Sequence, residues 1–144
     1  MKKSKMMKSK NSVCGFTLLE ALIVLVILGI VVSVAYPSYQ AHVVKAARAE
    51  AIVLLLDAAN RQEQYYVDNR TYTDTLSDIG VSETTERGYY TISLEVKDNE
   101  FVVKATPVAG PVKNDTQCTV LKINELGQKL STGSGSAKQC WNQK

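Results

Sequence analysis

A run of 21 residues from Phe16 to Tyr36 constrains this chain more than any other feature, because it is almost free of charge. Its first twenty residues contain one ionisable side chain, Glu20. A helix rises about 1.5 Å per residue, so a helix of this length spans about 30 Å, the thickness of a bilayer's hydrocarbon core. A carboxylate near the start of such a span is costly unless a specific group pairs with it. Glu20 is therefore a candidate functional residue.

A short basic segment precedes the apolar run. Residues 1–15 contain five lysines and no acid, which is typical of the start of a secretory signal. However, the run is long enough to span a bilayer, and the chain continues past Tyr36-Pro37 as apparent helix. The change in character lies between Gly15 and Phe16. The sequence therefore predicts an anchor that keeps its apolar run and follows a short leader.

The residues at this junction carry a family resemblance. The segment Gly15-Phe16-Thr17-Leu18-Leu19-Glu20, the apolar run and then Ala35-Tyr36-Pro37-Ser38-Tyr39-Gln40 resemble the N-terminus of type IV pilins. The resemblance covers residues 1 to about 40 strongly and the remainder loosely. It implies that a prepilin peptidase cuts after Gly15 and N-methylates Phe16. It also implies that Glu20 acts in filament assembly and that Pro37 bends the helix.

The helical pattern continues beyond the proline. Residues 38–66 are rich in good helix formers, and apolar residues recur there at intervals of three, four and seven. We expect one helix from Phe16 to about Val67, bent near Pro37 because proline removes a backbone donor and clashes with the preceding turn. Arg48 and the other charged side chains of this segment are expected to lie mostly off its apolar stripe.

The rest of the chain predicts a sheet. Residues 90–96 and 101–105 alternate apolar and polar around a turn, and 118–123 and 128–131 form a second such pair. The connection 68–88 is expected to hold one helical turn, with Thr75 and Asp78 spaced as a capping box. The fold class is α+β: a long helix on an antiparallel sheet of three or four strands, as in the type IV pilin fold. The expected parts are leader 1–15, membrane or filament-core helix 16–37, and head domain 38–144.

The cysteines form a pair once the leader, which contains Cys14, is removed. If the lysine-rich end stays in the cytoplasm, the C-terminal part faces the oxidising side of the membrane. We therefore expect a disulfide between Cys118 and Cys140, which would contribute about 3 kcal/mol by closing a loop of about twenty residues. The alternative is two free thiols in a reduced domain.

No catalytic, cofactor or metal site is predicted. The lone histidine, His42, has no neighbouring cluster of ligand residues, and no phosphate-binding loop or zinc-protease motif occurs. Without the five leader lysines the chain has 12 basic and 14 acidic residues, so it lacks the overall basic charge of a nucleic-acid-binding protein. Residues 57–100 carry a formal charge of −6 and residues 104–144 carry +4. These segments are either complementary subunit surfaces or two solvated surfaces, and both interpretations stay open.

The resemblance implies a structural protein and not an enzyme: a subunit of a type IV pilus, most like a PilE-like type IVa minor pilin. The implied partners are other pilin subunits, prepilin peptidase and the inner-membrane assembly machinery. The implied location is the inner membrane, with the N-terminus cytoplasmic and the head periplasmic, and after assembly the extracellular pilus. Pilus assembly, twitching motility, adhesion or DNA uptake would be the wider process.

Three alternatives remain. A type II secretion pseudopilin is the first, although such proteins commonly lack the C-terminal cysteine pair. A signal-anchored periplasmic enzyme or ligand-binding domain is the second, and the missing catalytic constellation and Glu20 argue against it. The third is a DNA-binding competence pilin, which would bind nucleic acid as a partner. The overall charge of the chain does not indicate this partner. The expected DNA footprint is the +4 segment 104–144, and loss of binding on neutralising Lys113, Lys122, Lys129 and Lys138 would test it.

Overall fold

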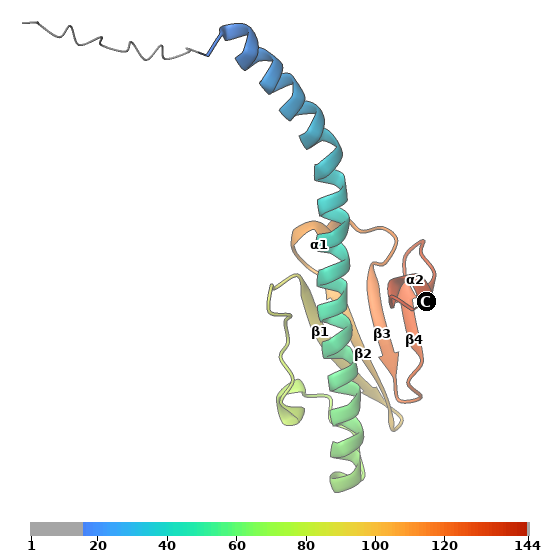
Figure 1. Cartoon of the computed structure of the whole chain (residues 1–144). Coiled ribbons are helices and arrows are strands. Elements are labelled where there is room, and N and C mark those ends of the chain that lie inside the picture. The colour runs from blue at the N-terminus through green and yellow to red at the C-terminus, as the bar shows by residue number, and fades with distance from the viewer. Residues whose placement is uncertain (1–15, 144) are drawn as a thin grey trace, which may run out of the picture. The chain divides into compact units, whose positions relative to one another are not determined.

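The computed structural model describes residues 16–143, and the chain divides into two compact units between Pro37 and Ser38. The elements in chain order are α1 (Leu18–Asn69), the 3-10 helix η1 (Leu76–Ile79), β1 (Tyr90–Lys97), β2 (Glu100–Pro107), the 3-10 helix η2 (Gly110–Asn114), β3 (Val120–Asn124), β4 (Lys129–Thr132) and α2 (Ala137–Cys140). The expected α+β class with one long helix and an antiparallel sheet is confirmed, and the sheet has four strands (Figure 1).

The first unit contains the N-terminal half of α1. The side chain of Thr17 accepts a hydrogen bond from the backbone N–H of Glu20 at 3.2 Å, so the helix begins two residues after the expected position with a threonine at its cap. By length and composition α1 can cross a membrane, and the apolar window that meets this test has no buried residues. Pro37 lies inside α1, and the bend expected there stays a prediction.

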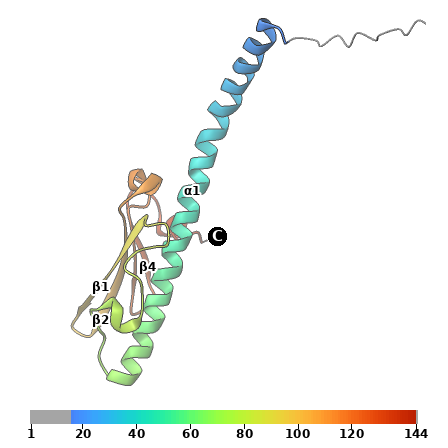
Figure 2. The same cartoon turned by 90° about the vertical axis from the view of Figure 1, so that its left-hand side faces the viewer.

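In the second unit, α1 lies along one face of the sheet (Figure 2). The side chains that pack there include Ala47, Ala51, Leu55 and Ala58, which recur every three or four residues and are at most 1% exposed. The small alanines allow the helix to approach the strands closely. The expectation for Arg48 was wrong. Its side chain is buried, because the carboxylate of Asp115 forms an ion pair with it.

The sheet is a meander in the order β1-β2-β3-β4, with every neighbouring pair antiparallel. Its face toward α1 carries Ile92, Val103, Ala105, Leu121 and Ile123, all at most 3% exposed. The β1–β2 turn lies in the expected connection between the two strands. Only two residues connect the strands, and both have positive φ angles (53° and 63°), which their identity as Asp98-Asn99 tolerates.

The connection between α1 and β1 is fastened to the helix by Gln62, which is fully buried. Its amide donates to the Thr73 carbonyl at 2.6 Å and accepts from the Thr73 N–H at 3.3 Å. The helical turn expected near Leu76 is present as η1, but the capping box is wrong, since Thr75 makes no side-chain cap bond there. Instead, the hydroxyl of Thr73 donates to the carboxylate of Asp78 at 2.7 Å.

Candidate functional site

The residues expected at the processing and assembly site lie at the start of the described chain. Gly15 lies outside the described residues. Phe16 precedes α1 with its side chain 71% exposed, and Glu20 is the acidic residue of the first helical turn. A carboxylate at this position interacts favourably with the helix macrodipole, by about 0.3–1 kcal/mol. Apart from Thr17, the described side chains within one helical turn of Glu20 are apolar, and all of them are exposed.

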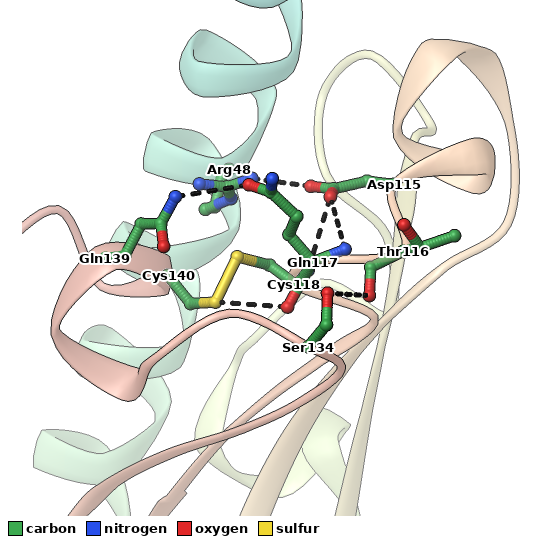
Figure 3. Close-up of polar contacts among 8 residues, drawn as sticks. All are labelled: Arg48, Asp115, Thr116, Gln117, Cys118, Ser134, Gln139 and Cys140. Atoms are coloured by element: carbon green, nitrogen blue, oxygen red, sulfur yellow. Dashed lines mark hydrogen bonds and ion pairs between the residues drawn. A yellow bond between two sulfur atoms is a disulfide. The ribbon is translucent and has the colours of Figure 1, made fainter.

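A buried ion pair connects α1 with the C-terminal part of the head (Figure 3). Nη2 of Arg48 lies 2.5 Å from Oδ2 of Asp115, and the two side chains are 7% and 9% exposed. The other carboxylate oxygen of Asp115 accepts from the backbone N–H groups of Gln117 and Cys118, at 3.0 and 3.2 Å. Asp115 therefore uses both oxygens and connects the helix directly to the first cysteine of the disulfide.

The hydroxyl of Tyr90 is buried beside this pair, where it interacts with the Arg48 guanidinium but forms no well-aligned hydrogen bond among the described residues. Burial raises the pKa of Tyr90 above its usual value of 10.0, and the Asp115 charge adds to this, while the Arg48 guanidinium opposes it. Nε of Arg48 is also buried without a hydrogen-bond partner in the described part of the chain. The bonds of this cluster run from Arg48 to Asp115 and from the Gln117 and Cys118 N–H groups to Asp115, so they hold α1 to the disulfide region.

The disulfide joins Cys118 to Cys140, the pair expected from the sequence, across a separation of 22 residues, and both cysteines are fully buried. The loop before α2 passes very close to the backbone at Gln117. Gly135 donates to the Gln117 carbonyl oxygen at 2.9 Å. At Gly133, where φ is +121°, a Cβ atom would lie 2.3 Å from that same oxygen, so only glycine fits there.

The four lysines whose neutralisation would test DNA binding lie on four different elements, and the strand register puts Lys122 and Lys129 on opposite faces of the sheet. Lys122 on β3 points away from α1, because its neighbours in the strand, Leu121 and Ile123, are the buried residues. Directly across from it on β2 is Lys104, which forms an ion pair with Glu95. The other three expected residues are Lys113 in η2, Lys129 in β4 beside the Trp141 ring, and Lys138 in α2.

Sequence reasoning missed the ion pair between Arg48 and Asp115. The available signal was weak: Arg48 follows Ala47 at the edge of the apolar stripe, and Asp115 lies three residues before Cys118. Neither spacing by itself separates a buried pair from two solvated charges. The pairing joins residues 67 positions apart, so only the fold reveals it.

Comparison with protein-family models gives two matches. Residues 10–36 match the model described as the prokaryotic N-terminal methylation motif. Residues 37–122 match the model described as type IV minor pilin ComP, DNA uptake sequence receptor. The two matches adjoin at the proline, and the second covers more than half of the chain.

Similar proteins agree with these matches. A fimbrial protein of Neisseria meningitidis serogroup A is 36% identical over 118 residues, 81% of this chain and 63% of its own length. A serogroup B fimbrial protein is 35% identical over 125 residues, 86% of this chain and 69% of its own length. The chain thus spans about two thirds of these curated relatives.

The crystal structure of the N. meningitidis non-core minor pilin PilV has a TM-score of 0.51 and 24% identity, covering 66% of this chain and 92% of PilV, which supports the fold. From the two family models, the fimbrial relatives and this shared fold, we conclude that the chain belongs to the type IV pilin family.

Proposed function

We propose that this chain is a structural subunit of a type IV pilus, held in a membrane by the N-terminal half of α1 before assembly. The observation that carries the proposal is this half-helix, whose apolar side chains are exposed throughout its candidate span. A continuous apolar surface of this extent requires lipid or protein around it. Lipid covers it before assembly, and the helices of neighbouring subunits cover it in the fibre.

The proposed assembly step depends on Glu20. Cleavage after Gly15 by prepilin peptidase creates a new amine on Phe16, which the same enzyme methylates. In the fibre core, an unpaired carboxylate would be penalised by several kcal/mol. The Phe16 amine of a neighbouring subunit would remove this penalty, and only one axial stagger brings the two charges together. The exposed position of Glu20 in the first turn of α1 supports this role.

The charges of the head support contacts between subunits. Asp74, Asp78, Glu83 and Glu86 lie in the connection 70–89, which reaches the β1 edge of the sheet through a bridge between Thr84 and Thr91. Lys122, Lys129 and Lys138 lie on β3, β4 and α2, toward the other edge (Figure 1). The acidic and basic segments therefore flank opposite sides of the sheet, which suits neighbours that meet by unlike surfaces.

The fibre itself provides the test of this function. Cells that make the chain are sheared, and the released fibres are analysed by quantitative mass spectrometry. We expect a peptide that begins with N-methylated Phe16, at a ratio to the main fibre subunit far below one, because we propose a minor pilin. Absence of the chain from fibres that are otherwise intact would contradict the function. A ratio near one would contradict only the minor role.

A second candidate function is DNA binding in the assembled pilus, and the match of residues 37–122 to a model described as a DNA uptake sequence receptor favours it. Lys104 and Lys122, opposite one another on the outer face of the sheet, place two positive charges side by side that this function could use. Glu95 neutralises part of this charge through its ion pair with Lys104.

Electrostatic contacts to phosphate weaken with salt, and each one contributes about one unit to the slope of log affinity against log salt. For DNA binding by the mature full-length chain in detergent, we expect Lys122→Gln to lower affinity and to reduce this slope by about one. Lys113→Gln is the matched control on a different element. Equal binding by the wild type and Lys122→Gln would exclude this face.

A further inference from the structure

A cavity of about 460 Å³ opens on the head between α1, η2 and α2. One wall is apolar and consists of Ala41, Val44 and Pro111. The side chains of Lys45 and several amide residues complete the lining: Asn114, Gln117, Gln139 and Asn142. The amide of Gln139 donates to the side-chain oxygen of Gln117 at 3.1 Å, which holds this side of the cavity in place (Figure 3). The cavity therefore combines an apolar wall with a polar rim, as ligand and interface pockets do.

The charges of the lining are not balanced. Arg48 and Asp115 both border the cavity, but they neutralise each other in the buried ion pair. Lys45 is exposed and forms no ion pair with any residue of the part of the chain that the structure describes. The cavity thus presents one uncompensated positive charge beside an apolar wall. A group that fits it should carry an apolar side chain next to a carboxylate.

The β3–β4 turn presents such a pair. Leu126 is 72% exposed at its tip, and Glu125 precedes it without an ion pair among the described residues. The turn is held by Asn124, whose carbonyl accepts from Gly127 at 2.9 Å and whose side chain accepts from the Gln128 N–H at 2.8 Å. Leu126 is therefore presented by a fixed turn, which lowers the entropic cost of inserting it into a partner.

The turn and the cavity lie at opposite ends of the sheet. The cavity adjoins η2 and α2, which follow the ends of β2 and β4, whereas the turn follows the end of β3. In an antiparallel meander the ends of β2 and β4 lie together and the end of β3 lies at the far end, as Figure 1 shows. The turn of one molecule therefore cannot occupy its own cavity, but it can occupy that of another.

We propose that the β3–β4 turn of one copy inserts into this cavity on a second copy of the chain. Leu126 packs against Ala41, Val44 and Pro111, and the carboxylate of Glu125 approaches Lys45. A protruding apolar residue that fits a pocket elsewhere on the same molecule makes a head-to-tail contact, which repeats from copy to copy along a filament unless its rotation closes a ring. This contact deepens the proposed pilus-subunit function, and rests on it, by assigning one surface between heads. It requires that the few copies of a minor subunit lie next to one another in the fibre.

Site-specific photo-crosslinking tests this contact in the full chain. A benzophenone amino acid replaces Leu126 in cells that make pili, and the adducts are mapped by mass spectrometry in sheared fibres and in membranes. We expect adducts with peptides that contain residues 41–48 or 111–117 of a second copy. The same probe at Val53, which is 65% exposed on α1, is the matched control and should not label these peptides.

Charge exchange then tests the polar half of the contact with the probe in place. Lys45→Glu and Glu125→Lys should each lower the adduct yield about tenfold or more, because like charges then meet. The double variant should restore it. An intact disulfide in non-reducing peptide maps checks that each variant folds.

Adducts only with other peptides or with a different pilin, or no adduct in either fraction, would overturn the contact. So would a yield that does not respond to the charge changes. The presence of the wild-type chain in fibres is scored separately. A chain found in fibres without these adducts would overturn the contact and leave the pilus function intact. A chain absent from fibres would overturn that function, and the membrane fraction would still decide the contact.

Discussion

Replacement of Arg48 by methionine should destabilise the head strongly. The substitution keeps a long apolar side chain but leaves the carboxylate of Asp115, which is 9% exposed, without its cation. Asp115 would still accept from Gln117 and Cys118, so the carboxylate cannot turn out to solvent without losing two further hydrogen bonds. Removing one partner of a buried pair costs about 3–5 kcal/mol. For a domain of about 100 residues, this loss lowers the melting temperature by at least about 12 °C.

The assay for this prediction uses Trp141, the sole tryptophan of the chain. Its side chain is 4% exposed, and its Nε1 donates to the Leu130 carbonyl at 2.9 Å, so its fluorescence reports unfolding of the head. The mature chain is unfolded in detergent with urea, and the free energies of unfolding of wild type and variant are compared. Lys97→Met is the matched control. It removes an ion pair whose two side chains are more than 80% exposed and should have little effect.

A double variant separates the ion pair from simple packing. Asp115→Asn keeps an oxygen for the two backbone N–H groups but removes the negative charge. We expect Arg48→Met with Asp115→Asn to be less destabilised than the sum of the single variants by about 1–3 kcal/mol. A free energy for Arg48→Met within 1 kcal/mol of wild type, or additive single effects, would refute the account of this pair as the connection between α1 and the disulfide region.

Three further predictions concern other parts of the head. Gly133→Ala should destabilise it by several kcal/mol in urea unfolding, because the new Cβ would meet a backbone carbonyl oxygen at 2.3 Å. Gly88→Ala, also at positive φ but in open space, should cost only about 1 kcal/mol. Gln62→Leu should cost about 2 kcal/mol or more by leaving the buried N–H and carbonyl of Thr73 unpaired, and faster proteolysis of the connection 70–89 would show it. Burial raises the pKa of Tyr90. The stability that its protonated hydroxyl contributes is therefore fully present below pH 10 and is lost as the pH rises through the higher pKa of the folded state. Tyr90→Phe should flatten this alkaline loss in a series of unfolding curves.

The long helix and the four strands were predictable because their patterns are local. The apolar run of α1, the alternation in β1 and β2 and the turn at Asp98-Asn99 each depend on neighbours in the sequence. For α1, β1 and β2, the expected boundaries differ from the observed ones by two residues at most, as is usual at the frayed ends of helices and strands.

The positions that sequence analysis missed depend on contacts between distant segments. Arg48 and Gln62 interrupt the apolar stripe of α1 and are buried because Asp115 and Thr73 satisfy them. The capping box at Thr75 failed for a related reason, since Asp78 bonds to Thr73 instead. A polar side chain is buried without a large free-energy cost only when a hydrogen-bond or ion-pair partner lies beside it. A single sequence does not show which residue is that partner.

The most direct test of the central claim is Glu20→Ala in cells that assemble pili, scored for three properties of the same protein. We predict that the variant is still cleaved after Gly15 and still extracted with membranes, because neither step uses the carboxylate in the fibre core. We also predict that it is nearly absent from sheared fibres, whereas the control Glu63→Ala, on an exposed part of α1, enters them as the wild type does. A Glu20→Ala chain that is cleaved, inserted and incorporated at the wild-type level would contradict the account.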